Sequence, residues 1–598
     1  MQLSGSSNWL TSRKFHLPGP GKQGWPERIL FFLLLLISLV PVVLYWYLPS
    51  LDGPQHLCTS NVIVQIVKSN ELVNSFFSIN SEIVGNWTGH FILALFDYFL
   101  PGWLAEKCLI IIYYIGMALG FRYLLVSFMP GISLLSLLII PFSSTSLLML
   151  GYYNYSIAIV FLLFALGYWK RIETKPNLAK MSVFSILLLL TFLSHTFVYT
   201  ILGFILFIFI LVRFIDEMAA SDKKKAVFRD YSRKLLYILI AAIPSIYLWF
   251  RYLVLTRELT PYGSTASVCF QQLLDRLLRI EILTGFDHMR ETPPNRALLI
   301  CIVILILYAL VRKLVSTRSR QIADENSAGK DRRAFLAVSL SLLALYFVFP
   351  NEMISGNISN RIGILFFIAL IIWLNMIRFP RWLVIIAAAA IFVITVWHRW
   401  LTHGFFEVLN DEIAELTEIN DHLEPNSVIL PWRYNTNWVS RHFCCYAGLD
   451  MPVVNLGNPQ CMGQFPVVWD QEHFPNLFFG GKSTHYSKLS KEIENPRQRP
   501  IVFVDYVIIC GKGAFEQDTD NPRFKQMLNK YFEHVYTTSK GRAMLFRFKA
   551  GEKIVEIMGM MLNKEEWLEN IRIKAENRNI PLENMMILDA IYMYDKYY

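Results

Sequence analysis

The chain has 598 residues, of which 54% are hydrophobic and only 17% are charged, and its formal net charge is +10. Soluble globular proteins carry about 25% charged residues, so this composition excludes an ordinary soluble protein and indicates an integral membrane protein. The basic residues concentrate in short stretches between apolar segments, which is the positive-inside pattern of cytoplasmic loops and argues against nucleic acid as a partner. These stretches are residues 12–28, 170–180, 222–234, 312–333 and 378–381.

The first apolar segment, residues 29–48, contains no charged residue. Its length matches the roughly 20 residues that a helix needs to cross a bilayer. A cleavable signal peptide would have an apolar core of about 7–15 residues, followed by small residues at the cleavage site. The following sequence, PSLDGPQH, offers no such site. We therefore expect an uncleaved anchor, preceded by a cytoplasmic segment over residues 1–28.

Hydropathy and the basic stretches together predict about eleven membrane crossings within residues 29–400. An odd number of crossings places the N-terminus in the cytoplasm and the C-terminal third of the chain outside. We expect an integral protein of a bacterial inner membrane whose C-terminal domain is periplasmic. The expected spans are residues 29–48, 104–126, 131–149, 152–169, 180–197, 198–215, 235–254, 295–315, 334–350, 361–378 and 382–400.

Two long external loops are predicted, over residues 49–103 and 255–294. The first contains an apolar but short stretch, residues 88–100. Counting this stretch as a crossing would place Lys170 and Arg171 outside, against the positive-inside rule. We therefore predict that it forms a helix at the outer membrane surface.

From residue 401 the pattern changes to polar helices that alternate with short β-rich runs, which predicts an external α/β domain over residues 401–550. Its aromatic residues, among them Trp432 and His442, serve either the core or sugar binding. Residues 551–598 are expected to form a helical tail. The expected strands lie at 427–430, 451–456, 501–510 and 543–548, and the expected helices at 408–423 and 521–532.

The cysteine pattern does not indicate a metal site. None of the eight cysteines forms a C-x-x-C pair, so a zinc site is not expected. Outside the membrane, Cys444 or Cys445 could pair with Cys461 in an oxidising compartment. Buried free thiols are an equally good interpretation of these positions.

Asp52 and His56 follow the first predicted span almost at once, in the sequence LPSLDGPQHL. An Asp–Gly–Pro sequence is ordinary turn chemistry. The alternative is a catalytic carboxylate held at the boundary between lipid and water. A helix that begins at Pro54 would place His56 one turn inside, where it could orient an acceptor or bind phosphate.

This layout resembles the GT-C superfamily of membrane glycosyltransferases. The resemblance lies in Asp52 after the first span, in the surface helix of NWTGHFILALFDYFLPGWLAEK and in the strand-like DYVIICG of the external domain. It implies transfer of a sugar from a polyprenyl-phosphate donor to a glycan, lipid or protein acceptor on the external face, with inversion at the sugar. Asp52 would be the general base. The acidic pair that is frequent in the family is absent, so no cofactor is expected, and no motif supports a divalent cation.

Transfer from a lipid phosphate needs cations that stabilise the departing phosphate, and these should lie where spans reach the outer surface. Cations at span ends often only extend toward the interface, which is the alternative for each candidate. The candidates are Lys107, Arg251, Arg257 and Arg361, of which Arg361 is the best placed. Further substrate-binding candidates are His90, His195, Asp287 and His288.

The sequence thus predicts a membrane-bound, cell-envelope glycosyltransferase. Two alternatives stay open. A lipid or polysaccharide transporter or flippase would carry ionisable residues in the middle of its spans. A non-catalytic assembly protein would act through its external domain and would not need Asp52.

Overall fold

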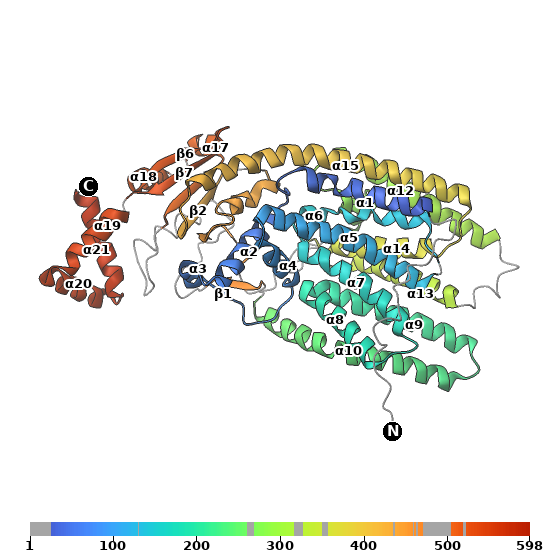
Figure 1. The fold of residues 1–598 in the computed structure, drawn as a ribbon. Helices are drawn as coiled ribbons and strands as arrows, with labels where there is room; N and C mark the ends of the chain where they lie inside the picture. Colours follow the sequence, from blue (N-terminus) through green and yellow to red (C-terminus); the bar gives the residue numbers. More distant parts are fainter. Residues whose placement is uncertain are drawn as a thin grey trace, which may run out of the picture.

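The computed structural model describes residues 25–129, 131–259, 268–315, 327–349, 357–434, 437–458, 460–461, 465–469, 504–517, 522–549 and 551–597. The described chain is mainly helical, with a bundle of long helices, a sheet region beside it and a group of helices at the C-terminus (Figure 1). The predicted fold class, a helical membrane bundle with a C-terminal α/β region, is confirmed in these terms.

The bundle is organised around α14, all of whose residues are buried and which packs against α13. A helix that is apolar on every side belongs in the middle of a bundle. The pair α5 and α7 forms a second central contact. The bundle helices are α1 (Trp25–Leu44), α5 (Gly102–Phe128), α7 (Tyr153–Ile172), α8 (Leu178–Ser194), α9 (Thr196–Ala220), α10 (Lys224–Leu259), α12 (His288–Val315), α13 (Ser327–Val348), α14 (Ile358–Asn375) and α15 (Arg381–Thr417).

Within the described ranges, eight helices are long and apolar enough to cross a membrane: α1, α5, α7, α9, α10, α12, α14 and α15. Each lies on one of the predicted spans. The predicted count of eleven is not confirmed. At the predicted spans 180–197 and 334–350, α8 has only 17 residues and α13 begins with the charged run 330–333.

The predicted span over residues 131–149 is not confirmed. This segment is broken into η1 (Leu134–Ile139), η2 (Pro141–Ser143) and the single turn α6 (Ser146–Met149). Pro141 has no N–H to continue a helix, and Ser133 and Thr145 each accept a bond from the backbone at a new start. The segment is apolar because it is buried inside the protein, which hydropathy does not distinguish from burial in lipid.

The segment over residues 49–103, predicted as the first external loop, folds at the end of the bundle next to the sheet region (Figure 1). It contains α2 (Gly53–Val67), α3 (Glu71–Phe76), β1 (Phe77–Ile79) and α4 (Thr88–Asp97). Helix α4 occupies the stretch predicted as a surface helix, and its ten residues are too few to cross a bilayer. Strand β1 pairs antiparallel with β4 (Val467–Trp469), which joins this loop to the C-terminal part of the chain.

The sheet region is built on five strands in the order β3-β2-β5-β7-β6. Strand β2 (Ser427–Arg433) pairs in parallel with β3 (Val453–Asn455) and with β5 (Tyr506–Cys510). Strands β7 (Ala543–Phe548) and β6 (Phe532–Thr537) complete the sheet in antiparallel pairings. Helix α18 (Pro522–Tyr531) covers it, with Phe524 stacked on Trp432 at 4.1 Å between ring centroids.

Two 3-10 helices connect the sheet to the bundle. Helix α15 runs along the bundle and reaches the sheet region, where η4 (Glu418–His422) follows it directly (Figure 1). Helix η5 (Val439–Tyr446) follows β2 and packs against both α2 and α15. The packing of η5 brings residues of the sheet region close to the first external loop.

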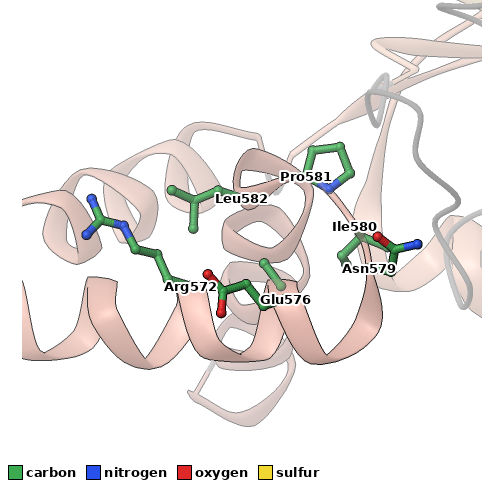
Figure 2. A pocket seen from close by; sticks show the side chains of 7 residues that line it. Arg572, Glu576, Asn579, Ile580, Pro581 and Leu582 are labelled. Atoms are coloured by element: carbon green, nitrogen blue, oxygen red, sulfur yellow. The ribbon is translucent and has the colours of Figure 1, made fainter.

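The C-terminal tail forms its own small apolar core from α19 (Gly551–Leu562), α20 (Glu565–Arg578) and α21 (Leu582–Tyr597). Asn579 ends α20 in the left-handed conformation, with a φ of 51°. A hollow of about 470 Å³ lies at this turn and is lined by Arg572, Ala575, Glu576, Asn579, Ile580, Pro581 and Leu582 (Figure 2). None of the predicted site residues lines it.

Candidate functional site

The backbone of Asp52 is held in place by the segment that precedes α7. The amides of Leu51 and Asp52 donate to the carbonyls of Met149 and Leu150, at 3.1 and 3.2 Å. Gly151 has a φ of +80°, and a Cβ at this position would lie 2.6 Å from the amide nitrogen of Gly53. The two segments therefore touch backbone to backbone, which only glycine allows at position 151.

Three hydrogen-bonded polar side chains, Ser50, Glu106 and Tyr153, hold this turn. The Tyr153 hydroxyl donates to Oε1 of Glu106 at 2.6 Å, and the Ser50 hydroxyl lies 2.9 Å from the Tyr153 oxygen. The amide of Gly53 in turn donates to Oγ of Ser50 at 3.1 Å. Glu106 is fully buried. Sequence reasoning did not select Glu106, although a carboxylate at the start of an apolar helix, in WLAEK, was an available signal.

The Asp52 side chain meets residues of η5. Its Oδ1 lies 3.8 Å from Nε2 of His442, and 24% of the side chain is exposed. Burial raises the pKa of Asp52 to about 7, and the positive charge of Arg441 acts in the opposite direction. Burial and the charges of Arg433 and Arg441 lower the pKa of His442 to about 3. His442 is therefore neutral at neutral pH, and its contact with Asp52 is not an ion pair.

Two arginines contribute positive charge beside Asp52 and His442. Arg441 is exposed, and the guanidinium of Arg433 donates to the backbone carbonyl of Arg441. Among the described residues, neither guanidinium is paired with a carboxylate. Sequence reasoning missed both arginines and treated His442 only as an aromatic residue. No local pattern indicates that they approach Asp52, because the packing of η5 against α2 brings them there.

His56 lies one turn inside α2, as the sequence predicts, and it is buried against His90. Its Nε2 donates to the carbonyl of Gly151 at 2.8 Å, and its Nδ1 lies 2.9 Å from Nε2 of His90. The Nδ1 of His90 lies 2.7 Å from the carbonyl of Asn86. Burial lowers the pKa of both histidines. Both ring nitrogens of His56 have protein partners, so this geometry positions α2, α4 and the Gly151 turn.

Arg361 and His195 belong to a different cluster. Arg361 lies over the rings of Tyr152 and Tyr155, at 4.9 and 5.8 Å from their centroids. The ring of His195 contacts Tyr155 edge to face at 5.2 Å. The Tyr155 hydroxyl donates to the Arg361 carbonyl at 2.5 Å. Arg361 therefore packs against the tyrosines at the start of α7, and the charge that acts on Asp52 comes from Arg441.

The remaining predicted residues also have other surroundings. The Nζ of Lys107 lies 3.5 Å from the carbonyl of Val43, and Arg251 pairs with Glu82 at 2.6 Å. Asp287 accepts a bond from the Met289 amide at 2.7 Å and so caps α12, while His288 is exposed. Arg257 is part of α10, but its side chain lies outside the described residues. In the described part of the chain, none of these side chains contacts Asp52.

Four of the cysteines, Cys58, Cys444, Cys445 and Cys510, lie together between α2 and the sheet region. All eight are free thiols in this structure, so Cys461 is not bonded to Cys444 or Cys445. Cys445 is instead buried with Cys58 and Cys444. Over the described ranges, no three His, Cys, Asp or Glu side chains are grouped in a way that could hold a metal ion.

No protein-family model matches the sequence, and no curated protein matches it either. Among solved structures, the chain is similar to the crystal structure of ArnT from Cupriavidus metallidurans bound to undecaprenyl phosphate. The similarity has a TM-score of 0.37 and 11% sequence identity, and it covers 88% of this chain and 98% of that chain.

Proposed function

We propose that this integral membrane protein is a glycosyltransferase that moves a sugar from a polyprenyl-phosphate donor to an acceptor hydroxyl at the external face of its membrane. The observation that carries the proposal is the surroundings of Asp52. A partly exposed carboxylate follows the first membrane helix, is fixed by the backbone, faces a neutral histidine, and feels the charge of Arg441, which has no carboxylate partner in the described part of the chain. The resemblance of the sequence to the GT-C superfamily agrees with this arrangement.

In the proposed reaction, Asp52 accepts the proton of the acceptor hydroxyl while the oxygen forms a bond to the anomeric carbon. The bond from that carbon to the phosphate oxygen breaks, and polyprenyl phosphate leaves with the electron pair. A base works best when its pKa lies near the working pH, and burial raises the pKa of Asp52 to about 7. The anomeric centre inverts because no protein group becomes attached to the sugar.

Arg441 is the group that we assign to the departing phosphate, because its positive charge acts on Asp52. A guanidinium carries its charge at all relevant pH values and suits the geometry of phosphate oxygens. Neutral His442 can donate a hydrogen bond to the same phosphate or to the acceptor. His56 and His90 are assigned a positioning role, since they hold α2 and α4 together behind Asp52.

The test is transfer of sugar from synthetic polyprenyl-phosphate sugars by the purified protein in detergent, compared with Asp52→Asn. We expect Asp52→Asn to lower kcat by about 10²-fold or more, which is typical for loss of a general base. Asp97→Asn is the matched control, because burial also raises the pKa of Asp97 to about 7 while its side chain accepts a bond from Ser60 in the same loop. Full transfer by Asp52→Asn would contradict Asp52 as the general base, and absence of transfer by the wild-type protein would support the non-catalytic assembly protein. Movement of the lipid across liposome membranes without transfer would support the flippase.

A further inference from the structure

A cavity of about 470 Å³ lies at the edge of the sheet where β2 and β5 end. Arg433 is the last residue of β2, and it is paired in register with Cys510, the last residue of β5. The parallel strands have the order β3-β2-β5, so the chain continues to one side of β2 and then crosses to the other. In open α/β sheets, ligands bind outside the carboxyl ends of the strands at this kind of switch point.

The wall of the cavity carries three cationic side chains from three separate segments: Arg433, Lys512 and Arg542. Arg542 is engaged by Asp411 and Glu415, at 3.1 and 3.2 Å. Lys512 forms a long, partly exposed ion pair with Glu516 at 3.8 Å, and the wall also carries the carboxylate of Glu412. Over the described ranges Arg433 has no carboxylate partner. Arg433 can therefore meet an anionic group, and Lys512 can join it because an exposed ion pair is weak.

Three glycines, Gly511, Gly513 and Gly541, also line the cavity. Gly511 and Gly541 have φ values of +94° and +71°, and a Cβ on Gly513 or Gly541 would meet no atom within 4 Å. Glycine at such positions allows a ligand to approach the backbone closely. A volume of this size accommodates one or two sugar rings. The cavity therefore combines room for a saccharide with the charge of Arg433, which has no carboxylate partner among the described residues.

The cavity and the surroundings of Asp52 share a wall. Ser440, Phe443 and Cys444 of η5 line the cavity, and the same short helix carries His442 toward Asp52. The guanidinium of Arg433 also donates to the backbone carbonyl of Arg441, which connects the cavity to the surroundings of Asp52. Only the outer end of α15 lines the cavity from the bundle side, through Glu412 and Leu416. This location suits a ligand that arrives from the aqueous phase.

We propose that this cavity binds an anionic saccharide, with a phosphate or carboxylate group held by Arg433 and Lys512, and that this saccharide is part of the acceptor. The role of the saccharide as acceptor rests on the proposed transferase function, because it places an acceptor hydroxyl at Asp52 while the anionic group lies in the cavity. Binding of the saccharide is a separate property that does not depend on catalysis.

Binding is measured with the full-length protein in detergent, by calorimetry and saturation-transfer NMR. The probes are glucose 6-phosphate, glucuronate, glucose and inorganic phosphate. We expect one of the two anionic sugars to bind, more weakly as salt is raised, and glucose and inorganic phosphate to bind at least about tenfold more weakly. Comparison of glucose 6-phosphate with glucuronate identifies the anionic group.

The variants Arg433→Gln and Lys512→Gln should each weaken binding by about tenfold or more, since each removes a charge-assisted contact. Arg547→Gln is the matched control, because Arg547 is an arginine of the same sheet that pairs with Glu424 at 3.5 Å and does not line the cavity. Lys512→Gln keeps the test decisive if Arg433→Gln does not fold. Equal binding of glucose, equal binding of inorganic phosphate, or equal losses in Arg547→Gln would each overturn the proposal.

Asp52→Asn separates this proposal from the proposed reaction. We expect it to bind the anionic sugar as the wild type does while it loses transfer. If the wild-type protein binds the sugar but transfers nothing to it under any condition, the cavity stands as a binding site and its acceptor role is wrong.

Discussion

Asp52 and His442 face each other at 3.8 Å, Oδ1 to Nε2, although one follows the first membrane helix and the other lies in η5 of the sheet region. The contact brings a carboxylate that titrates near neutral pH beside an imidazole that stays uncharged. Burial is the main cause of both pKa changes, because it disfavours the charged form of each group. The proposed chemistry follows from this shared burial together with the charge of Arg441.

The pH dependence of transfer should reflect the ionisation of Asp52. We expect kcat/KM to rise with pH, with an apparent pKa of about 7, because the base must be ionised and burial raises the Asp52 pKa to about 7. Arg441→Gln removes the charge that lowers this pKa, so the ascending limb should move to higher pH. The pH profiles of both proteins, with Asp97→Asn as the control, test this. A limb that stays in place in Arg441→Gln would contradict the assignment.

Asp52→Asn should stabilise the folded protein above about pH 7 and change little below about pH 4. A carboxyl whose folded pKa is raised stabilises the fold while it is protonated, and this contribution is lost as the pH rises through the folded pKa of about 7. Asparagine carries no charge at either pH. The gain should be on the order of a few kcal/mol at most, at about 1.4 kcal/mol for each pKa unit. Thermal unfolding of both proteins in one detergent at the two pH values measures it, and equal melting temperatures throughout would contradict the buried environment.

Gly151→Ala should destabilise the protein by about 1–3 kcal/mol and reduce transfer. The new Cβ would need a φ of +80° and would lie 2.6 Å from the Gly53 amide nitrogen, so the turn that holds Asp52 must move. Gly203→Ala is the control, since a Cβ on Gly203 in α9 meets nothing within 4 Å. Thermal unfolding and kcat of the two variants are compared. Similar results for both would show that the backbone contact does not position Asp52.

Tyr153 and Glu106 should act as one unit. Tyr153→Phe leaves Oε1 of buried Glu106 without the hydroxyl that lies at 2.6 Å, which should cost about 1–3 kcal/mol. Glu106→Gln should cost a similar amount, and the double variant should be less destabilised than the sum of the two. The double-mutant cycle is measured by unfolding. Strict additivity would mean that the two groups do not interact.

The sequence by itself determined the class of the protein and the location of Asp52 shortly after the first apolar helix. It also determined the position of the eight described helices that are long and apolar enough to cross a membrane. These features depend on local sums, since hydropathy over about 20 residues and the nearest turn residues suffice to predict them. The strands β3, β5 and β7 also lie within the predicted segments, and β2 begins at the predicted residue but runs on to Arg433. Short apolar runs bounded by polar residues are a local signal.

The tertiary structure decided which charged groups meet Asp52. Arg361 is the best candidate by its position at a span end, but the packing of α14 against α7 directs it to Tyr152 and Tyr155. Arg441 is placed beside Asp52 by the packing of η5 against α2, a contact between distant parts of the chain. The packing of η1 and η2 against α5, α14 and α15 buries residues 135–149 within the protein, where hydropathy alone predicts a membrane span. Hydropathy summed over neighbouring residues shows how apolar a segment is, whereas the packing of the whole chain decides which residues surround it.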